Sequence, residues 1–154
     1  MILGTSVVVA TTLKPLNDTR TILTLQGNIQ SADPISLSLS DLQALPQHQL
    51  VTSTAVTDGT LTFDGVLMRD LLASVSAQGS TVVAEASNGY SIDIPWADTQ
   101  NYNVLVAWAV DGVLLEPSGK GPLWIVYPRD QFRQLRDIRY DYRWVWQLNR
   151  LIIK

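Results

Sequence analysis

Polar and apolar residues alternate along several short stretches of the chain, which is the pattern of half-buried β-strands. The clearest alternation covers residues 21–27, residues 35–39 and the closing segment 144–153. Two other stretches, residues 104–110 and 123–127, are almost wholly apolar. We expect these two to form central strands that are covered on both faces.

Turn-forming residues mark the ends of further strands. The Asn-Gly pair at residues 88–89 is a strong hairpin signal, and it joins expected strands at residues 81–86 and 90–94. Two more strands, rich in Thr, Val and Leu, are expected at residues 49–56 and 61–63. The pattern therefore predicts a protein built from many short strands.

Two short helices are expected between the strands. Ser40 is a favourable N-cap for a helix over residues 41–45, which Pro46 ends. The apolar residues of segment 66–73 fall near one helical face, so this segment predicts the second helix, with Gly65 in a loop before it. Many short strands with two small helices define an α+β domain.

The start of the chain differs from the rest. Residues 1–10 are mildly apolar, and residues 5–13 are rich in Val and Thr. They fit the end of a trimmed signal peptide or an ordered N-terminal strand, and the absence of a basic region leaves both open. We predict an N-terminal arm or signal-peptide remnant at residues 1–20 and a single domain over residues 21–154.

Composition narrows the classes of function. The chain has 154 residues, 46% of them hydrophobic and 16% charged, and a net charge of −3. This suits one folded domain. A nucleic-acid-binding protein normally has a basic surplus, which is absent here. No apolar run is long enough to span a membrane.

The chain contains no cysteine, and its one histidine is His48. Disulfides, zinc ribbons, iron–sulfur sites and cysteine nucleophiles are therefore excluded. A single histidine also argues against multi-histidine metal sites and Ser-His-Asp hydrolysis.

Seven short phrases follow one another in an order that is more specific than any one of them. They read LTLQGNI, SLSDLQALP, FDGVLMRDLL, NGYSIDIP, VDGVLL, GPLWIVYP and WVWQL. This succession, spanning residues 22–152, resembles the molybdopterin-binding domain of the sulfite oxidase family. The resemblance implies the α+β fold of that family, with a pterin cofactor in a pocket lined by loops at strand ends.

The resemblance fails where the family's enzymes hold molybdenum. Those enzymes use a cysteine after the strand equivalent to residues 50–54, followed by an arginine-rich signature. Here Thr54 takes roughly the place of the cysteine, and the signature reads Val56-Thr57-Asp58. A thiolate is a soft anionic ligand, and a threonine hydroxyl is neither soft nor anionic. The pocket is therefore expected to persist without its metal ligand.

A smaller branch is similar in length and in lacking the cysteine: the exported, stand-alone, PruR-like pterin-binding proteins of bacteria. This resemblance implies a periplasmic protein that binds a free, neopterin-like pterin. It also implies a partner, the periplasmic region of a membrane-bound cyclic-di-GMP enzyme (a diguanylate cyclase or phosphodiesterase). On this reading no cofactor is required, and a molybdenum cofactor is not expected.

A pterin is a flat ring that stacks on aromatic side chains, and its polar edge suits carboxylate, hydroxyl and backbone groups. The candidate ligand-binding residues share a place at strand ends: Thr54, Asn88, Tyr90, Trp96, Asp98, Tyr127, Arg129 and Arg143. Asp58 and Trp146 also lie at strand ends, but Trp146 is expected to belong to the core. No catalytic or metal-binding residue is predicted.

Most of these candidates have a structural alternative. Trp96 could cap the core, and Asp98 could N-cap a short turn. Asn88 is favoured by the hairpin alone, and Tyr90 could pack against a residue of the paired strand. The two arginines could form surface pairs with Asp130 and Asp141, which contribute little to stability.

Three functions remain open. The first is a pterin-binding protein that is not an enzyme. The second is an oxidoreductase of the sulfite oxidase family whose molybdenum is held by the cofactor's own dithiolene. The third is an interaction domain whose pocket is packed shut.

Overall fold

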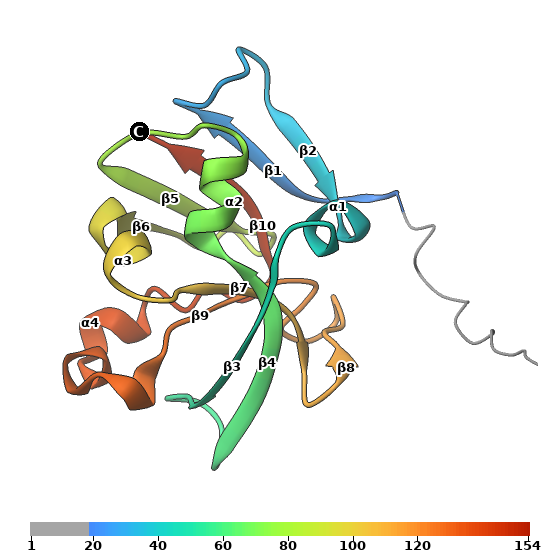
Figure 1. Cartoon of the computed structure of the whole chain (residues 1–154). Helices are drawn as coiled ribbons and strands as arrows, with labels where there is room; N and C mark the ends of the chain where they lie inside the picture. The colour runs from blue at the N-terminus through green and yellow to red at the C-terminus, as the bar shows by residue number, and fades with distance from the viewer. Residues whose placement is uncertain (1–18) are drawn as a thin grey trace, which may run out of the picture.

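The computed structural model describes residues 19–154, which form two β-sheets with short helices at their margins (Figure 1). One sheet has the order β2-β1-β10-β5-β6, and the other has the order β3-β4-β7-β8, with β9 also paired to β7. The N-terminal strand or arm expected at residues 5–13 lies outside the described residues. The proposed domain boundary at residues 20 and 21 stays a prediction.

The first sheet combines the two ends of the described chain. Its strands are β1 (Thr21–Gly27), β2 (Ile35–Ser38), β5 (Thr81–Ala86), β6 (Ser91–Pro95) and β10 (Leu148–Ile153). The first and last strands, β1 and β10, pair in parallel, whereas the other neighbours are antiparallel. The last strand therefore lies in the middle of the sheet, and it fixes the segment that precedes it.

The second sheet holds the apolar strands. It consists of β3 (Gln47–Ser53), β4 (Thr60–Leu67), β7 (Leu105–Val110), β8 (Val113–Leu114) and β9 (Trp124–Val126). Strand β7 lies between β4 and both β8 and β9. The prediction of buried central strands is confirmed, because all three residues of β9 and the first five of β7 are buried.

The described helices are short: α1 (Leu39–Gln43), α2 (Met68–Ser74), α3 (Trp96–Asn101) and α4 (Ile138–Asp141). Two 3-10 turns, η3 (Arg129–Gln131) and η4 (Arg133–Arg136), precede α4. The expected polar loop at residues 131–139 is therefore partly helical, and the count of two helices was too low. In the described part of the chain no helix has the length and apolar character that a membrane span needs.

Helix α1 begins earlier than predicted. Its N-cap is Ser38 and not Ser40: the Ser38 hydroxyl accepts from the Asp41 N–H at 3.1 Å, and the Asp41 carboxylate accepts from the Ser38 N–H at 2.9 Å. This reciprocal pair is a capping box, which satisfies two backbone donors that the helix cannot satisfy itself.

Strand β4 is longer than the predicted strand at residues 61–63. Val66 and Leu67 pair with Val106 and Leu105 of β7, so the helix expected from residue 66 begins at Met68. Gly65 belongs to this strand and not to a loop. A β-carbon on Gly65 would lie 2.1 Å from the carbonyl oxygen of Val106, so only glycine permits the close approach of β4 and β7.

Two other strands are shorter than predicted. Strand β3 ends at Ser53 and not at residue 56, and the final strand begins at Leu148 and not at residue 144. Both differences leave irregular chain beside the sheets. These irregular segments, residues 54–59 and 142–147, carry most of the side chains discussed below.

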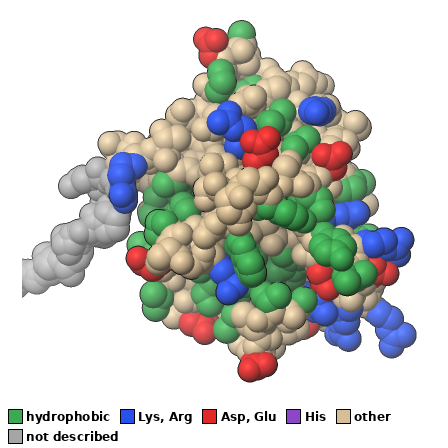
Figure 2. Space-filling model, turned by 180° about the vertical axis from the view of Figure 1, so that it is seen from behind, with side chains coloured by type: hydrophobic (Ala, Val, Ile, Leu, Met, Phe, Trp, Pro, Cys, Tyr) green, Lys and Arg blue, Asp and Glu red, His purple; other side chains and the backbone are tan. Residues whose placement is uncertain are grey.

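Basic side chains are concentrated in one part of the surface. Five of the chain's 11 lysines and arginines lie between residues 129 and 143: Arg129, Arg133, Arg136, Arg139 and Arg143. Figure 2 shows Lys and Arg side chains gathered toward the lower right of the face that it presents, with some acidic side chains among them. The acidic chain thus has a locally basic region around η4 and α4.

Candidate functional site

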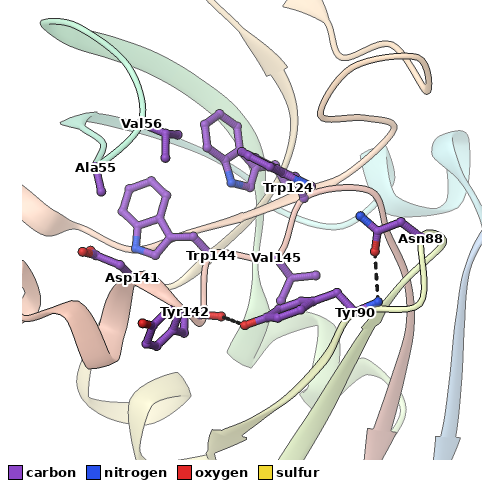
Figure 3. Close-up of a pocket in the computed structure, with 10 residues that line it drawn as sticks. Ala55, Val56, Asn88, Tyr90, Trp124, Asp141, Tyr142, Trp144 and Val145 are labelled. Atoms are coloured by element: carbon purple, nitrogen blue, oxygen red, sulfur yellow. Dashed lines mark hydrogen bonds between the residues drawn. The ribbon is translucent and has the colours of Figure 1, made fainter.

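Four segments that are distant in sequence enclose a cavity of about 300 Å³ (Figure 3). The loop after β3, the β5–β6 hairpin and β9 supply Ala55, Val56, Asn88, Tyr90 and Trp124. The segment from α4 to β10 supplies Asp141, Tyr142, Trp144, Val145 and Trp146. This volume lies at the lower end of the ~300–1,000 Å³ range of small-molecule sites.

The wall of the cavity is dominated by tryptophan. Trp124 is buried on β9, and its ring centroid lies 6.0 Å from that of Trp144 and 6.3 Å from that of Trp146. Behind it, Phe63 packs edge-on against Trp124 at 5.3 Å and fixes the indole from the sheet side. Such a wall offers flat aromatic surface to a planar ligand.

Two indole N–H groups in this wall have no partner. The Nε1 atoms of Trp124 and Trp144 are buried, and no hydrogen-bond acceptor for them exists among the described residues. A buried donor without an acceptor costs about 1–3 kcal/mol, and most native groups of this kind are satisfied. Two residues of the cavity wall therefore carry buried donors without an acceptor.

One carboxylate faces the same space. Asp141, at the end of α4, accepts a hydrogen bond on Oδ1 from Arg129 at 2.5 Å. No hydrogen bond from the described residues reaches its second oxygen, Oδ2. Figure 3 shows Asp141 beside the Trp144 indole at the margin of the cavity. The polar groups of the site are thus a carboxylate with one hydrogen-bonded oxygen, Asp141, and the two unpartnered indole N–H groups.

The β5–β6 hairpin closes the site from the other side. The Asn88 side chain accepts from the Tyr90 N–H at 2.9 Å, which orders the turn, and the Tyr90 hydroxyl donates to the Tyr142 carbonyl at 2.7 Å. Burial, and second the neighbouring Tyr142, raise the pKa of Tyr90. Among the eight predicted ligand-binding residues, Asn88 and Tyr90 are the two that line this cavity.

Thr54 is close to the cavity but does not line it. Its side chain is buried, its hydroxyl lies 2.6 Å from that of Thr57, and it accepts from the Val56 N–H at 3.1 Å. The next two residues, Ala55 and Val56, face the cavity instead, with apolar side chains. Asp58, on the same loop, is exposed and outside the cavity.

These side chains fit a pterin ring but not a protein-bound metal. The hydroxyl in the place of the family's thiolate is occupied within its own loop, and the next two side chains, Ala55 and Val56, carry no ligand atoms. Across residues 19–154, no three His, Asp or Glu side chains come together in a metal-binding arrangement. The aromatic wall and its unpartnered N–H groups suit the organic part of the cofactor.

Three predicted ligand-binding residues form a separate buried network. The Asp98 carboxylate accepts from the Tyr127 hydroxyl at 2.7 Å and from Arg143 at 2.6 Å, and none of the three lines the cavity. Asp98 lies inside α3, whose N-cap position is Pro95, so the alternative of Asp98 as an N-cap was wrong. The Arg143 guanidinium also lies 4.6 Å from the Tyr140 ring centroid.

The network perturbs ionisation. The pKa of Tyr127 lies well above its usual value, first because the hydroxyl is buried and second because the Asp98 carboxylate disfavours a tyrosinate beside it. The Asp98 carboxylate in turn raises the pKa of Arg143, although burial opposes this. The arginine therefore stays charged and keeps its place immediately before Trp144.

The ion pairs agree in part with the alternative considered for the two arginines. Arg129 pairs with Asp141, one of the two expected carboxylates, whereas Arg143 pairs with Asp98. Asp130 instead accepts from the Ser53 hydroxyl at 2.5 Å and the Ser53 N–H at 2.8 Å. These bonds, the hydroxyl's first, lower the pKa of Asp130. They fix η3 to the end of β3.

Two tryptophans lie in environments opposite to those expected for them. Trp96 begins α3 and packs against the hydrophobic core, outside the cavity. Trp146, expected in the core, is 37% exposed and lines the cavity. Trp124, Asp141 and Trp144 were missed as site residues. The Trp-Val-Trp phrase was the available signal, but its alternation was interpreted as a strand.

Family comparison defines the class of the domain. Residues 14–134 match the family described as the oxidoreductase molybdopterin-binding domain, so the chain belongs to that family. Its mixed sheets and short helices have the sulfite-oxidase-type fold, as the resemblance implied. The pocket residues from Asp141 onward lie beyond the matched range. A search of curated proteins gives no match.

Solved structures share the fold. One of them is the sulfane dehydrogenase SoxCD from Paracoccus pantotrophus, which superposes with a TM-score of 0.66 at 20% sequence identity. The match covers 90% of this chain and 38% of that chain. The present chain thus spans well under half the length of that dehydrogenase, and at this identity the likeness concerns the fold.

Proposed function

We propose that this domain binds a free pterin in the tryptophan-walled cavity and serves as a ligand-binding protein rather than as an enzyme. The observation that carries the proposal is that Trp124 and Trp144, which line a cavity of about 300 Å³, both have a buried, unpartnered indole N–H group. A pterin has ring nitrogens and a carbonyl oxygen as acceptors, so it can satisfy donors that the protein leaves open.

The carboxylate gives the ligand an orientation. The aminopyrimidine edge of a pterin presents adjacent N–H donors, and Asp141 Oδ2 is the complementary acceptor at the margin of the cavity. The ring would then lie among Tyr90, Trp144 and Trp146, with its acceptor atoms toward the indole N–H groups. Arg129 orients Asp141 by donating a hydrogen bond to its other oxygen at 2.5 Å.

The wider role follows from the resemblance to the PruR-like branch. We propose that the protein is exported to the periplasm and reports pterin to the periplasmic region of a membrane-bound cyclic-di-GMP enzyme. The missing thiolate supports binding over catalysis, because molybdenum would have no protein ligand in the loop at residues 54–57. No other cofactor is needed for such a role.

Membership of the molybdopterin-binding family favours a second candidate, an oxidoreductase that holds molybdenum through the cofactor alone. When bound, that cofactor would supply a redox-active metal. Metal analysis of protein purified from a molybdenum-replete host distinguishes the two. Stoichiometric molybdenum would support the enzyme, and its absence together with bound pterin would support the binding protein.

Isothermal titration with neopterin and 7,8-dihydroneopterin tests the proposal. We expect saturable heat with at least one of them and a weaker interaction for Asp141→Asn, which removes the edge-binding charge. Asp137→Asn is the matched control, because Asp137 also pairs with an arginine of this segment but lies outside the cavity. No heat and no thermal shift with any pterin would contradict the proposal.

A further inference from the structure

Lys120 lies against the tryptophan wall from the loop between β8 and β9. Its ammonium nitrogen is 4.9 Å from the ring centroid of Trp146 and 5.6 Å from that of Trp124. Both rings line the cavity. A cation over an indole face is attracted by the electrons of the ring, so these contacts hold the ammonium against two rings of the cavity wall.

The loop that carries Lys120 is fixed at several points. The Gln147 N–H donates to the Lys120 carbonyl at 3.0 Å, and the Gln147 side chain donates to the Gly119 carbonyl at 2.8 Å. The Gly121 N–H donates to the Glu116 carbonyl at 2.9 Å. Because its backbone is braced against the start of β10, the lysine is placed by the fold and not by chance on a free surface.

The charge of Lys120 is not neutralised. Within residues 19–154 no carboxylate forms an ion pair with it, whereas Asp141 at the cavity is already paired with Arg129. An ammonium without a paired carboxylate therefore lies against the tryptophan wall of a chain whose net charge is −3.

From this geometry we infer that the site selects a flat ring that carries an oxyanion, a carboxylate or a phosphate, with the ring on the indoles and the anion at Lys120. The inference rests on the proposed function and names its ligand class. The ammonium offers three N–H donors, and indole contact occupies none of them in a hydrogen bond. A charge-assisted bond to an oxyanion is about twice as strong as a neutral one.

Paired titrations test the inference. Calorimetry with 6-carboxypterin and with neutral 6-hydroxymethylpterin compares ligands that share the same ring. We expect wild-type protein to bind the carboxylate about tenfold or more tightly, and this preference to weaken with added salt. Lys120→Met should abolish the preference and Lys120→Arg should keep it. Lys154→Met, which removes the same charge at the C-terminus, should leave it unchanged.

The outcomes separate the two proposals. Equal affinity for the two ligands, or a preference that survives Lys120→Met, would overturn the anion selectivity while leaving pterin binding in place. No binding of either ligand to wild-type protein would overturn both. If Lys120→Met fails to fold, the salt dependence in wild-type protein decides: an affinity difference that is insensitive to salt would overturn the inference.

Discussion

Arg143 donates to the carboxylate of Asp98 at 2.6 Å, and this contact joins α3 to the segment that carries five of the cavity's side chains. The arginine comes directly before Trp144, so its position sets where the chain enters the site. Tyr127 donates to the same carboxylate oxygen at 2.7 Å and ties the end of β9 to the pair. The network acts on the site by positioning it.

Replacing Asp98 with asparagine should destabilise the fold and weaken the site together. The change leaves the Arg143 charge without its counter-ion, and we expect a loss of about 2–4 kcal/mol in the free energy of unfolding. Urea denaturation measures it. Glu85→Gln removes a half-exposed partner of Arg150 and should change stability by less than about 1 kcal/mol. Equal effects of the two substitutions would contradict this account.

Stability should fall in alkali because of Tyr127. Its pKa is raised in the folded protein, so above the ordinary tyrosine value of about 10 the unfolded chain releases a proton that the folded chain retains. This contribution is intact below pH about 10 and is lost progressively above it. Urea midpoints measured across this range should fall less steeply for Tyr127→Phe. Parallel slopes for the two proteins would count against the buried network.

The β5–β6 hairpin, the buried central strands and the resemblance to the family could be predicted from the sequence, because each depends on short stretches of neighbouring residues. The Asn-Gly turn forces the β5–β6 hairpin, and the apolar run over β7 leaves no exposed face. The cavity could not be predicted in the same way. Trp144 and Trp146 alternate as they would in a strand, but the chain becomes regular only at Leu148, after Gln147 with its φ of 54°.

The polar candidates show the same limit. Asp98, Tyr127 and Arg143 are the residue types that bind ligands, and the sequence cannot distinguish that use from a network among themselves. Their separations of 29 and 45 residues are closed by the tertiary fold. Gly65 illustrates the reverse case, since a glycine before an apolar run suggested a loop, while the close pairing of β4 with β7 requires it within a strand.

Gly65→Ala should be strongly destabilising. The added methyl group would lie 2.1 Å from the Val106 carbonyl oxygen, so the two central strands must separate. We expect a cost of about 1–3 kcal/mol or more, as for overpacked cores, measured by thermal or urea unfolding. Gly119→Ala is the control, because its nearest neighbour atom would be 3.7 Å away. A Gly65→Ala protein as stable as the control would refute the close approach.

Asp130 should titrate below its ordinary range because of Ser53. The serine hydroxyl and N–H stabilise the carboxylate, so this contribution to stability is present above the unfolded pKa of about 4 and is lost as the pH falls. Ser53→Ala should raise the pKa of Asp130 in a carboxyl-carbon NMR titration. Ser91→Ala, at the exposed start of β6, should leave it unchanged. An Asp130 pKa that does not respond to Ser53→Ala would contradict the assignment.

A crystal structure of the protein with bound neopterin tests the central claim most directly. We expect the bicyclic ring in the cavity between Tyr90 and Trp144, with its aminopyrimidine edge at Asp141 and acceptor atoms within hydrogen-bond distance of the Trp124 and Trp144 N–H groups. A ring bound instead beside Trp96 and Tyr127, or a cavity that stays without ligand at saturating neopterin, would contradict the account.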